Sequence, residues 1–170
     1  RGDVGTAVLD GKFYAVGGWE PNDGPLSSVE RYDLATKAWE AVAPMATARA
    51  NLAAVVLDGK LYAVGGYDGN DLSSVERYDP ALNAWEAVAA MGTARQLAAP
   101  AVLDGKLYAV GGLREGSSLS SVERYDPAVN MWEAVAPMAT AREAPAVAVL
   151  DGKLYAAGGY NINYGDLSRL

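Results

Sequence analysis

Residues 57–66 read LDGKLYAVGG, and close variants of this stretch occur four times in the 170-residue chain. The shared pattern is LDGK-x-YA-x-GG. Its aspartate stands at positions 10, 58, 104 and 151, which are 48, 46 and 47 residues apart. A fixed period of this length predicts a repeat architecture in which each unit is one supersecondary element that packs on its neighbours.

The segments around this stretch predict four short strands per unit. Residues 52–57 form an apolar run, as in a strand buried on both faces, and Asp58-Gly59 is a tight-hairpin dipeptide. Residues 60–66 and 73–79 supply two alternating segments, and a turn then leads to the strand 85–89. Four antiparallel strands without a helical period describe one blade of a β-propeller.

The same order of segments recurs along the chain. LSSVERYD ends at Asp33, Asp79 and Asp126, and a T-A-R segment ends at Arg49, Arg95 and Arg142. We therefore expect an all-β fold with three complete four-stranded blades, at about 1–48, 49–94 and 95–141, and a partial fourth at 142–170. Because an open arc exposes its flanks, we expect a portion of a longer ring or a ring closed by further blades of another chain.

These residues resemble the Kelch family over nearly the whole chain. The resemblance rests on two glycines after the second strand, a tyrosine before the third turn and a tryptophan opening the fourth strand. The positions are Gly17, Gly18, Tyr32 and Trp39; Gly65, Gly66, Tyr78 and Trp85; Gly111, Gly112, Tyr125 and Trp132; and Gly158 and Gly159. The period also fits Kelch repeats better than the shorter WD40 repeat. The resemblance implies a propeller that binds a protein or peptide partner through its loops.

The residues that recur in every unit have a structural interpretation. Glycine permits a positive φ or a close backbone approach, and each buried Tyr or Trp ring contributes about 1.5–3 kcal/mol when packed between blades. The alternative is that Trp39, Trp85 and Trp132 form a stacking platform for a ligand. The repeated Glu-Arg pairs, such as Glu76-Arg77, predict solvated strand faces or ion pairs within or between blades.

The units differ in length at one place only. The loop between the double glycine and the following serines spans residues 19–26, 67–72, 113–119 and 160–167, which is eight, six, seven and eight residues. A second variable spot is the link after the repeated arginine. Both connections lie at the same end of an antiparallel four-stranded blade, so we expect them to form one recognition surface on a constant scaffold.

This predicted surface is rich in acidic and aromatic side chains. The candidate contact residues are Asp3, Trp19, Glu20, Asp23, Asn51, Tyr67, Asp68, Asp71, Gln96, Arg114, Glu115, Glu143, Tyr160, Asn161, Tyr164 and Asp166. Their charge favours a cationic protein or peptide, and the aromatic rings could anchor it. The alternative is a set of solvated turns with incidental aromatic residues.

Composition argues against several other functions. The net charge of −7 without a basic run disfavours nucleic acid and acidic membranes, and no run of apolar residues is long enough to span a bilayer. The chain has no histidine and no cysteine, so His- or Cys-based catalysis is excluded, and we expect no cofactor and no metal.

We therefore expect a scaffold rather than an enzyme. Two alternatives remain open. The near-identical, alanine-filled repeats also fit a designed or structural self-assembling unit without a natural ligand. A carbohydrate-active propeller enzyme would need paired carboxylates, and the available ones lie in turn-like contexts.

Overall fold

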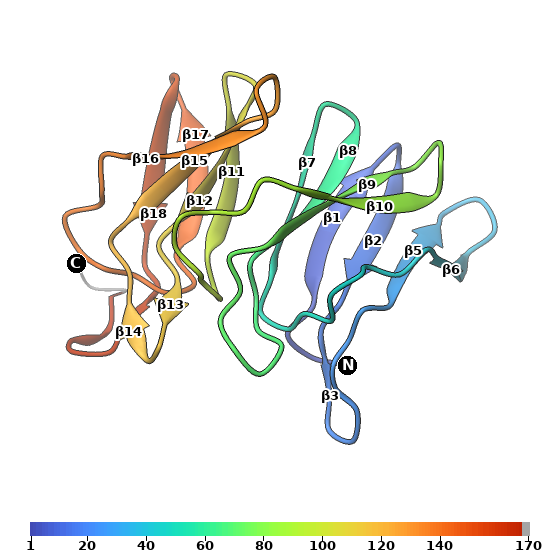
Figure 1. The fold of residues 1–170 in the computed structure, drawn as a ribbon, viewed down its shortest axis with the longest axis horizontal. Coiled ribbons are helices and arrows are strands. Elements are labelled where there is room, and N and C mark those ends of the chain that lie inside the picture. Colours follow the sequence, from blue (N-terminus) through green and yellow to red (C-terminus); the bar gives the residue numbers. More distant parts are fainter. Residues whose placement is uncertain (168–170) are drawn as a thin grey trace.

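The computed structural model describes residues 1–167, and within this range the chain consists of strands and turns without a helix (Figure 1). None of the described elements is therefore a helix long and apolar enough to cross a membrane. Three four-stranded antiparallel sheets follow one another, and a two-stranded sheet follows the third. The predicted all-β architecture, with three complete blades and a partial fourth, is confirmed.

The strand bounds show how regular the units are. The first sheet contains β1 (Gly5–Leu9), β2 (Lys12–Val16), β5 (Val29–Asp33) and β6 (Ala38–Val42). The second contains β7 (Ala53–Leu57), β8 (Lys60–Val64), β9 (Val75–Asp79) and β10 (Ala84–Val88). The third contains β11 (Ala99–Leu103), β12 (Lys106–Val110), β15 (Val122–Asp126) and β16 (Met131–Val135). The fourth contains β17 (Ala146–Leu150) and β18 (Lys153–Ala157), and its expected third strand lies outside the described residues.

The first two strands of each unit are joined by the predicted tight turn. In the second sheet, Leu57 pairs with Lys60 across Asp58 and Gly59, whose φ angles are 49° and 67°. Positive φ at both central residues is the geometry that an Asp-Gly hairpin turn requires. The first strands of successive units, β1, β7, β11 and β17, contact one another, so the sheets radiate from a common axis as propeller blades do.

The hydrophobic core lies between the sheets. One cluster joins Leu9, Tyr14 and Val16 of the first sheet to Leu61 and Tyr78 of the second. A second cluster repeats this contact between the second and third sheets, with Leu57, Tyr62 and Val64 against Leu107 and Tyr125. Because the second sheet is packed between the first and the third, its stability depends on the blades beside it.

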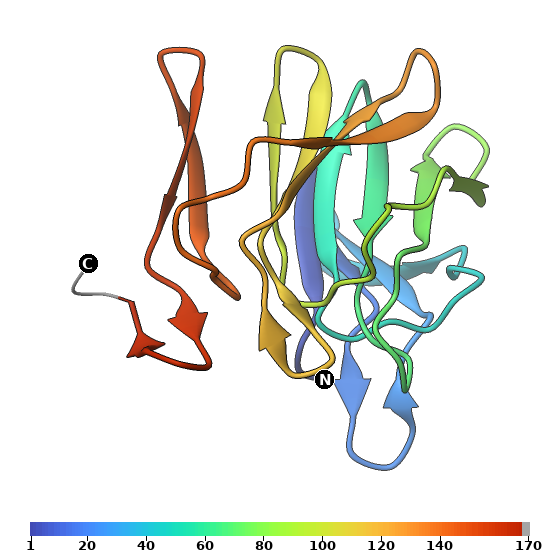
Figure 2. The same cartoon turned by 60° about the vertical axis from the view of Figure 1, so that its left-hand side comes forward.

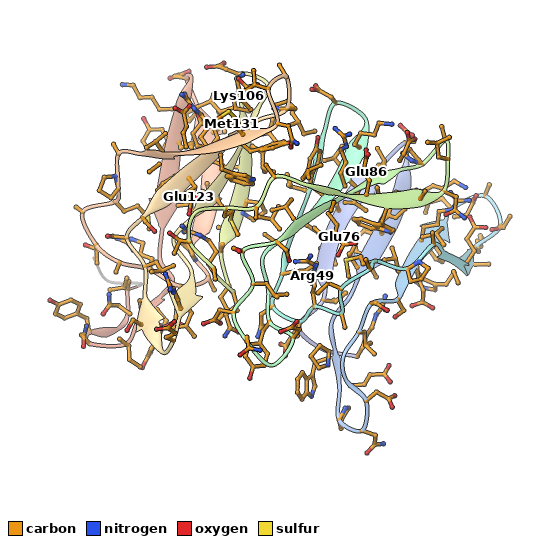
Figure 3. All side chains as sticks on the ribbon, viewed as in Figure 1. Arg49, Glu76, Glu86, Lys106, Glu123 and Met131 are labelled. Atoms are coloured by element: carbon orange, nitrogen blue, oxygen red, sulfur yellow. The ribbon has the colours of Figure 1, made fainter. Side chains whose placement is uncertain are left out.

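The repeated arginine crosses each of these interfaces. Arg49 is fully buried, and its Nη1 donates hydrogen bonds to the carbonyl oxygens of Gly65 (2.8 Å) and Ser74 (2.9 Å) in the next unit. Its Nη2 pairs with Glu76 Oε1 at 3.0 Å, and burial lowers the pKa of Arg49 while Glu76 opposes that change. Arg95 makes the same contacts with the third unit, including Glu123 at 2.6 Å. Arg49, Glu76 and Glu123, which are all buried, are labelled in Figure 3.

The two residues of the repeated Glu-Arg pair have different roles. Glu76 is buried and also accepts hydrogen bonds from the backbone N–H groups of Ala46 (2.7 Å) and Thr47 (3.0 Å), so it fastens two sheets together. Arg77 pairs instead with Glu86 on the neighbouring strand of its own sheet, near the surface. Both alternatives for these pairs, between blades and within a blade, therefore occur.

The double glycine is held between two links. A Cβ atom on Gly65, where φ is 60°, would overlap the carbonyl oxygen of Arg95 in the following link. A Cβ atom on Gly66, where φ is 103°, would lie 2.8 Å from the carbonyl oxygen of Ala50 in the preceding link. Glycine is thus required at both positions by backbone conformation and by the close approach of neighbouring units.

Two of the three repeated tryptophans, Trp85 and Trp132, pack between blades as predicted. Trp85 Nε1 donates to the carbonyl oxygen of Ala43 in the preceding unit at 2.9 Å, and Trp132 Nε1 donates to Ala89 at the same distance. Within the described residues no other sheet packs against Trp39 of the first sheet, and 49% of this residue is exposed. The environment of this ring therefore depends on whether a neighbouring sheet covers it.

Candidate functional site

The variable loops emerge at the end of the sheets opposite the tight hairpins (Figure 1). Three of them fold back as two-stranded hairpins that the sequence did not predict: β3 (Trp19–Glu20) with β4 (Gly24–Pro25), β13 (Leu113–Arg114) with β14 (Ser117–Ser118), and β19 (Tyr160–Asn161) with β20 (Gly165–Asp166). The shorter loop 67–72 forms a single bridge between Tyr67 and Asp71. The loops therefore have defined structure while differing in sequence.

The links lie directly beside these loops. Gly2 and Trp19 exchange two backbone hydrogen bonds, of 3.0 and 2.8 Å, and Ala50 and Tyr67 repeat the exchange at 2.9 and 2.8 Å. Gln96 and Leu113 exchange two backbone hydrogen bonds in the same way, and so do Glu143 and Tyr160. The prediction that both variable regions share one end of the blades is confirmed. We call loops 19–26, 67–72, 113–119 and 160–167, with links 2–3, 50–51, 96–97 and 143–144, the variable rim.

The links also bond to one another around the axis. Asn51 N–H donates to the Asp3 carbonyl, Leu97 N–H to the Asn51 carbonyl and Ala144 N–H to the Leu97 carbonyl, at 2.8–2.9 Å. These link residues have φ angles of 46° to 55°. A left-handed conformation costs a non-glycine residue about 1–2 kcal/mol, and this hydrogen-bonded series offsets that cost. The links surround a depression of about 420 Å³.

Two further hollows lie between neighbouring loops. One of about 430 Å³ separates the loops of the second and third sheets and is lined by the predicted contact residues Tyr67, Asp71, Arg114 and Glu115. The other, of about 640 Å³, lies at the loop of the fourth unit, where Asn161, Tyr164 and Asp166 line it. Together these hollows form a concave surface on the rim along which a peptide chain could bind.

Most of the predicted contact residues reach solvent. The exposed ones are Asp3, Trp19, Asp23, Asp68, Arg114, Glu115, Tyr160, Tyr164 and Asp166. Those that are partly exposed are Glu20, Asn51, Tyr67, Asp71 and Gln96. Tyr164 is the most exposed of the large apolar side chains, at 76%, and Ile162 beside it is exposed at 54%. Arg114 is the one basic residue among the predicted contact residues, so their charge is predominantly negative.

Two predicted contact residues are instead buried. Glu143 is 8% exposed and accepts a hydrogen bond from Ser118 Oγ at 3.2 Å, and Asn161 is 3% exposed and donates from Nδ2 to the carbonyl of Ala141 at 2.7 Å. These bonds hold the link and the loop of the fourth unit to the third unit, and both side chains are largely buried. This corrects their assignment to the contact surface.

A side-chain network also fixes the centre of the rim. Asn51 Nδ2 donates to Gln96 Oε1 at 3.0 Å, and Gln96 Nε2 donates to Asp71 Oδ1 at 2.8 Å. The other oxygen of Asp71 accepts the N–H of Glu115 at 2.7 Å. These three side chains position the loops of the second and third sheets. Ser118 positions the loop of the fourth unit, because its hydroxyl bonds to Glu143 and to the N–H of Ile162. No repeated pattern in the sequence indicated this role.

The fold and its loop-bearing rim define a repeat protein of the β-propeller class, and the comparison with known sequences gives its family. The KLHDC2/KLHL20/DRC7 Kelch-repeats domain matches residues 6–170. The chain belongs to this Kelch-repeat family, whose members commonly mediate protein binding.

Two individual proteins show how much of a larger molecule the chain covers. It is 48% identical over 50 residues to the influenza virus NS1A-binding protein homolog of Xenopus laevis, which is 29% of this chain and 8% of that protein. The solved structure of YjhT superimposes with a TM-score of 0.80 at 19% identity, covering 94% of this chain and 59% of YjhT. The second match shows the propeller fold and a partial ring.

Proposed function

We propose that the chain is a non-catalytic interaction and scaffold module that holds a protein or peptide on its variable rim. The observation that carries the proposal is the pairing of each variable loop with a variable link by backbone hydrogen bonds. Backbone bonds do not depend on side-chain identity, so the rim can change its sequence while the scaffold stays constant. The hollows at the rim add concave surface for a ligand.

The chemistry of the rim favours a positively charged partner. Acidic side chains are spread over all the units, as at Asp23, Asp68, Glu115 and Asp166. Exposed rings at Trp19, Tyr160 and Tyr164 could supply apolar anchors for such a partner. Charge complementarity of this kind sets the association rate and the choice of partner, and it weakens as salt is added. The Xenopus relative is named as a binding protein, which agrees with this role.

The same proposal assigns no reaction to the chain. The sequence has no histidine or cysteine, which removes Ser-His-Asp and Cys-His catalysis. The rim carboxylates support electrostatic recognition. Turnover of a glycan or chromogenic glycoside in a substrate screen, abolished by Asp68→Asn or Asp166→Asn, would overturn this assignment in favour of a carbohydrate-active enzyme.

Selection from a peptide library tests the proposal. We expect Lys- and Arg-containing peptides to be enriched over acidic ones, with affinity that falls as salt is raised. The double variant Asp68→Lys, Glu115→Lys should lose this preference, and Tyr164→Ala should weaken binding of the selected peptides. The matched control is Leu82→Ala, an exposed residue at the opposite end of the second sheet.

Three results would contradict the proposal. Equal enrichment of acidic and basic peptides would remove the charge argument. Binding that survives the rim variants and is lost in Leu82→Ala would place the contact surface elsewhere. Failure to select any peptide would favour the alternative of a structural unit without a ligand.

A further inference from the structure

Six Asp-Gly dipeptides occur in the sequence, and they begin at Asp10, Asp23, Asp58, Asp68, Asp104 and Asp151. An aspartate before glycine can isomerise, because glycine has no Cβ atom to hinder the attack of its own backbone nitrogen on the aspartate carboxyl carbon. By sequence alone all six dipeptides are equally reactive. The structure separates them by the backbone conformation around each one.

Four of the dipeptides are held in tight hairpin turns. At Asp58-Gly59 both φ angles are positive, and Leu57 pairs with Lys60 directly across the turn. The first residue of such a turn has a ψ of about 30°, which places the glycine nitrogen on the side of the Cα–C bond away from Cβ. Closure of a five-membered ring needs that nitrogen and Cβ nearly eclipsed. The turn must therefore open before it reacts, and the same holds at Asp10, Asp104 and Asp151.

The fifth dipeptide, Asp23-Gly24, is restrained by its own hairpin. Gly24 lies in β4 and pairs with Glu20 of β3. A Cβ position on Gly24 lies 3.8 Å from the indole ring of Trp19. The strand pairing and the indole ring restrict the rotation of the main chain that closure of the five-membered ring requires.

The sixth dipeptide, Asp68-Gly69, lies in the shortest of the variable loops, at the end of the sheets opposite to the tight hairpins (Figure 2). Both residues are exposed, and Asp68 has no positive φ, unlike the aspartates of the hairpin turns. The Gly69 N–H has no hydrogen-bond partner among residues 1–167. Apart from its chain neighbours, no described atom lies within 4 Å of a Cβ position on Gly69. The attacking nitrogen is therefore free, and the space around it is open.

A hydrogen bond keeps the Asp68 carboxyl group beside the main chain that follows it. Asp68 Oδ1 accepts the N–H of Asn70 at 3.1 Å. Three aspartates outside the Asp-Gly dipeptides form the same kind of bond, but a leucine or a proline follows them: Asp33, Asp79 and Asp126. Leucine hinders the attack with its Cβ atom, and proline has no N–H to lose. Among residues 1–167, Asp68 alone combines this bond with a following glycine.

We propose that Asp68 is a modification site at which isoaspartate forms. The Gly69 nitrogen bonds to the Asp68 Cγ, and the carboxyl hydroxyl leaves with the amide hydrogen as water. Water then adds to the α-carbonyl carbon of the five-membered imide and breaks the bond from that carbon to nitrogen. The main chain afterwards runs through Cβ, and a carboxyl group remains on Cα. The two steps release and consume one water, and the product belongs to the substrate class of isoaspartyl carboxyl methyltransferases.

The change would reach the centre of the variable rim. It makes the main chain one methylene longer inside a loop that is closed by a single bridge between Tyr67 and Asp71. Asp71 bonds to Gln96 and to the N–H of Glu115, so a shift of this loop alters the hollow between the second and third sheets. The inference does not rest on the proposed partner, because the reaction needs only the chain and water.

Peptide mapping tests the proposal, because each Asp-Gly dipeptide falls in a different tryptic peptide: 2–12, 13–31, 50–60, 61–77, 96–106 and 143–153. The folded chain and a urea-unfolded sample are aged at neutral pH until every peptide of the unfolded sample contains isoaspartate. An isoaspartyl carboxyl methyltransferase with a labelled methyl donor measures the product. In the folded chain we expect at least about tenfold more label in 61–77 than in 50–60 or 96–106, since the hairpins react only when open. The unfolded sample should show similar label in all six peptides.

Asp68→Glu is the matched variant, because it keeps the charge while a glutamate would have to close a six-membered ring, which is much slower. It should remove the label from peptide 61–77 and leave the other five peptides unchanged. Electron-transfer fragmentation should locate the product at residue 68. Equal labelling of 61–77 and the hairpin peptides in the folded chain, no label in 61–77, or label located at Asp71 would overturn the proposal. The experiment contains no partner, so its outcome is separate from that of the rim proposal.

Discussion

The two ends of the sheets are held together by different kinds of bond. One end carries the tight hairpins and the turns between the third and fourth strands of each sheet. At this end, side chains form hydrogen bonds with backbone groups. Asn83 Oδ1 accepts the Ala43 N–H of the preceding unit at 3.0 Å and the Tyr78 hydroxyl at 2.9 Å, and Asn130 repeats both bonds. At the variable rim, every loop is held to its link by bonds between backbone groups, and side chains such as Asn51, Gln96 and Asp71 add bonds that differ from unit to unit. We call the first end the constant rim, comprising residues 10–11, 33–38 and their equivalents.

This difference explains why one rim keeps its sequence and the other varies. A turn held by an asparagine or aspartate side chain loses its bonds when that residue changes. A loop held by main-chain groups keeps its bonds with almost any residue. In the first unit Lys37 stands where the second and third units have Asn83 and Asn130.

The largest effect is expected beneath the variable rim, where the repeated arginine fixes each link. Arg95→Ala leaves Glu123 buried without its partner, which should lower the free energy of unfolding by about 3–5 kcal/mol. Arg142→Ala removes one hydrogen bond among residues 1–167, at a partly exposed site, and should cost about 1 kcal/mol. Urea unfolding followed by tryptophan fluorescence measures both. Equal losses would contradict the role of the buried pair.

The next effect concerns the close backbone approach at the rim. Gly111 and Gly158 have nearly the same φ, 62° and 61°, so alanine pays the same conformational cost at both. At Gly111 a Cβ atom also overlaps the Arg142 carbonyl, whereas at Gly158 it meets no atom of residues 1–167 within 4 Å. Gly111→Ala should therefore destabilise by about 1–3 kcal/mol more than Gly158→Ala in the same unfolding assay. A difference near zero would mean that the rim tolerates side chains where the structure places a contact.

A smaller effect separates the two rims directly. Asn83→Ala at the constant rim removes an acceptor used by two donors and should lower the free energy of unfolding by about 1–2 kcal/mol. Asn70→Ala in the exposed variable loop should change it by less than about 0.5 kcal/mol. If thermal unfolding midpoints shifted equally in both variants, the proposed division between side-chain and backbone anchoring would fail.

The smallest effect is a dependence on pH at the constant rim. The Lys12 ammonium, with the N–H groups of Ala35 and Thr36, lowers the pKa of Asp33 to about 2, and Lys60 and Lys106 lower the pKa values of Asp79 and Asp126. A carboxyl whose pKa is lower when folded contributes stability above its unfolded pKa, near 3.8, and loses it as pH falls towards 2.

Urea midpoints measured from pH 6 to pH 2 should therefore decline between pH 4 and pH 2. The triple variant Asp33→Asn, Asp79→Asn, Asp126→Asn should show a shallower decline over that interval. Identical profiles for the variant and the wild-type chain would show that these ion pairs do not stabilise the folded state.

The repeats made most of the fold predictable. Asp-Gly turns, alternating strands and a fixed period are local signals, and antiparallel topology then places the variable loops and links at one end. The buried state of Glu143 and Asn161 could not be predicted in this way, because their partners Ser118 and Ala141 belong to the third unit and lie in or beside variable segments. The Arg49–Glu76 pair is likewise a contact between units, and charged residues in repeated motifs look the same whether they are exposed or buried.

The central claim is that the variable rim contacts the partner and the constant rim does not. The most direct test is to titrate the ¹⁵N-labelled chain with a Lys- and Arg-rich peptide selected on it and to follow the amide shifts. We expect the shifts to be concentrated at residues 19–26, 67–72, 113–119 and 160–166 and at the adjoining links. Shifts concentrated at the Asp-Gly hairpins or at the 33–38, 79–84 and 126–131 turns would contradict it.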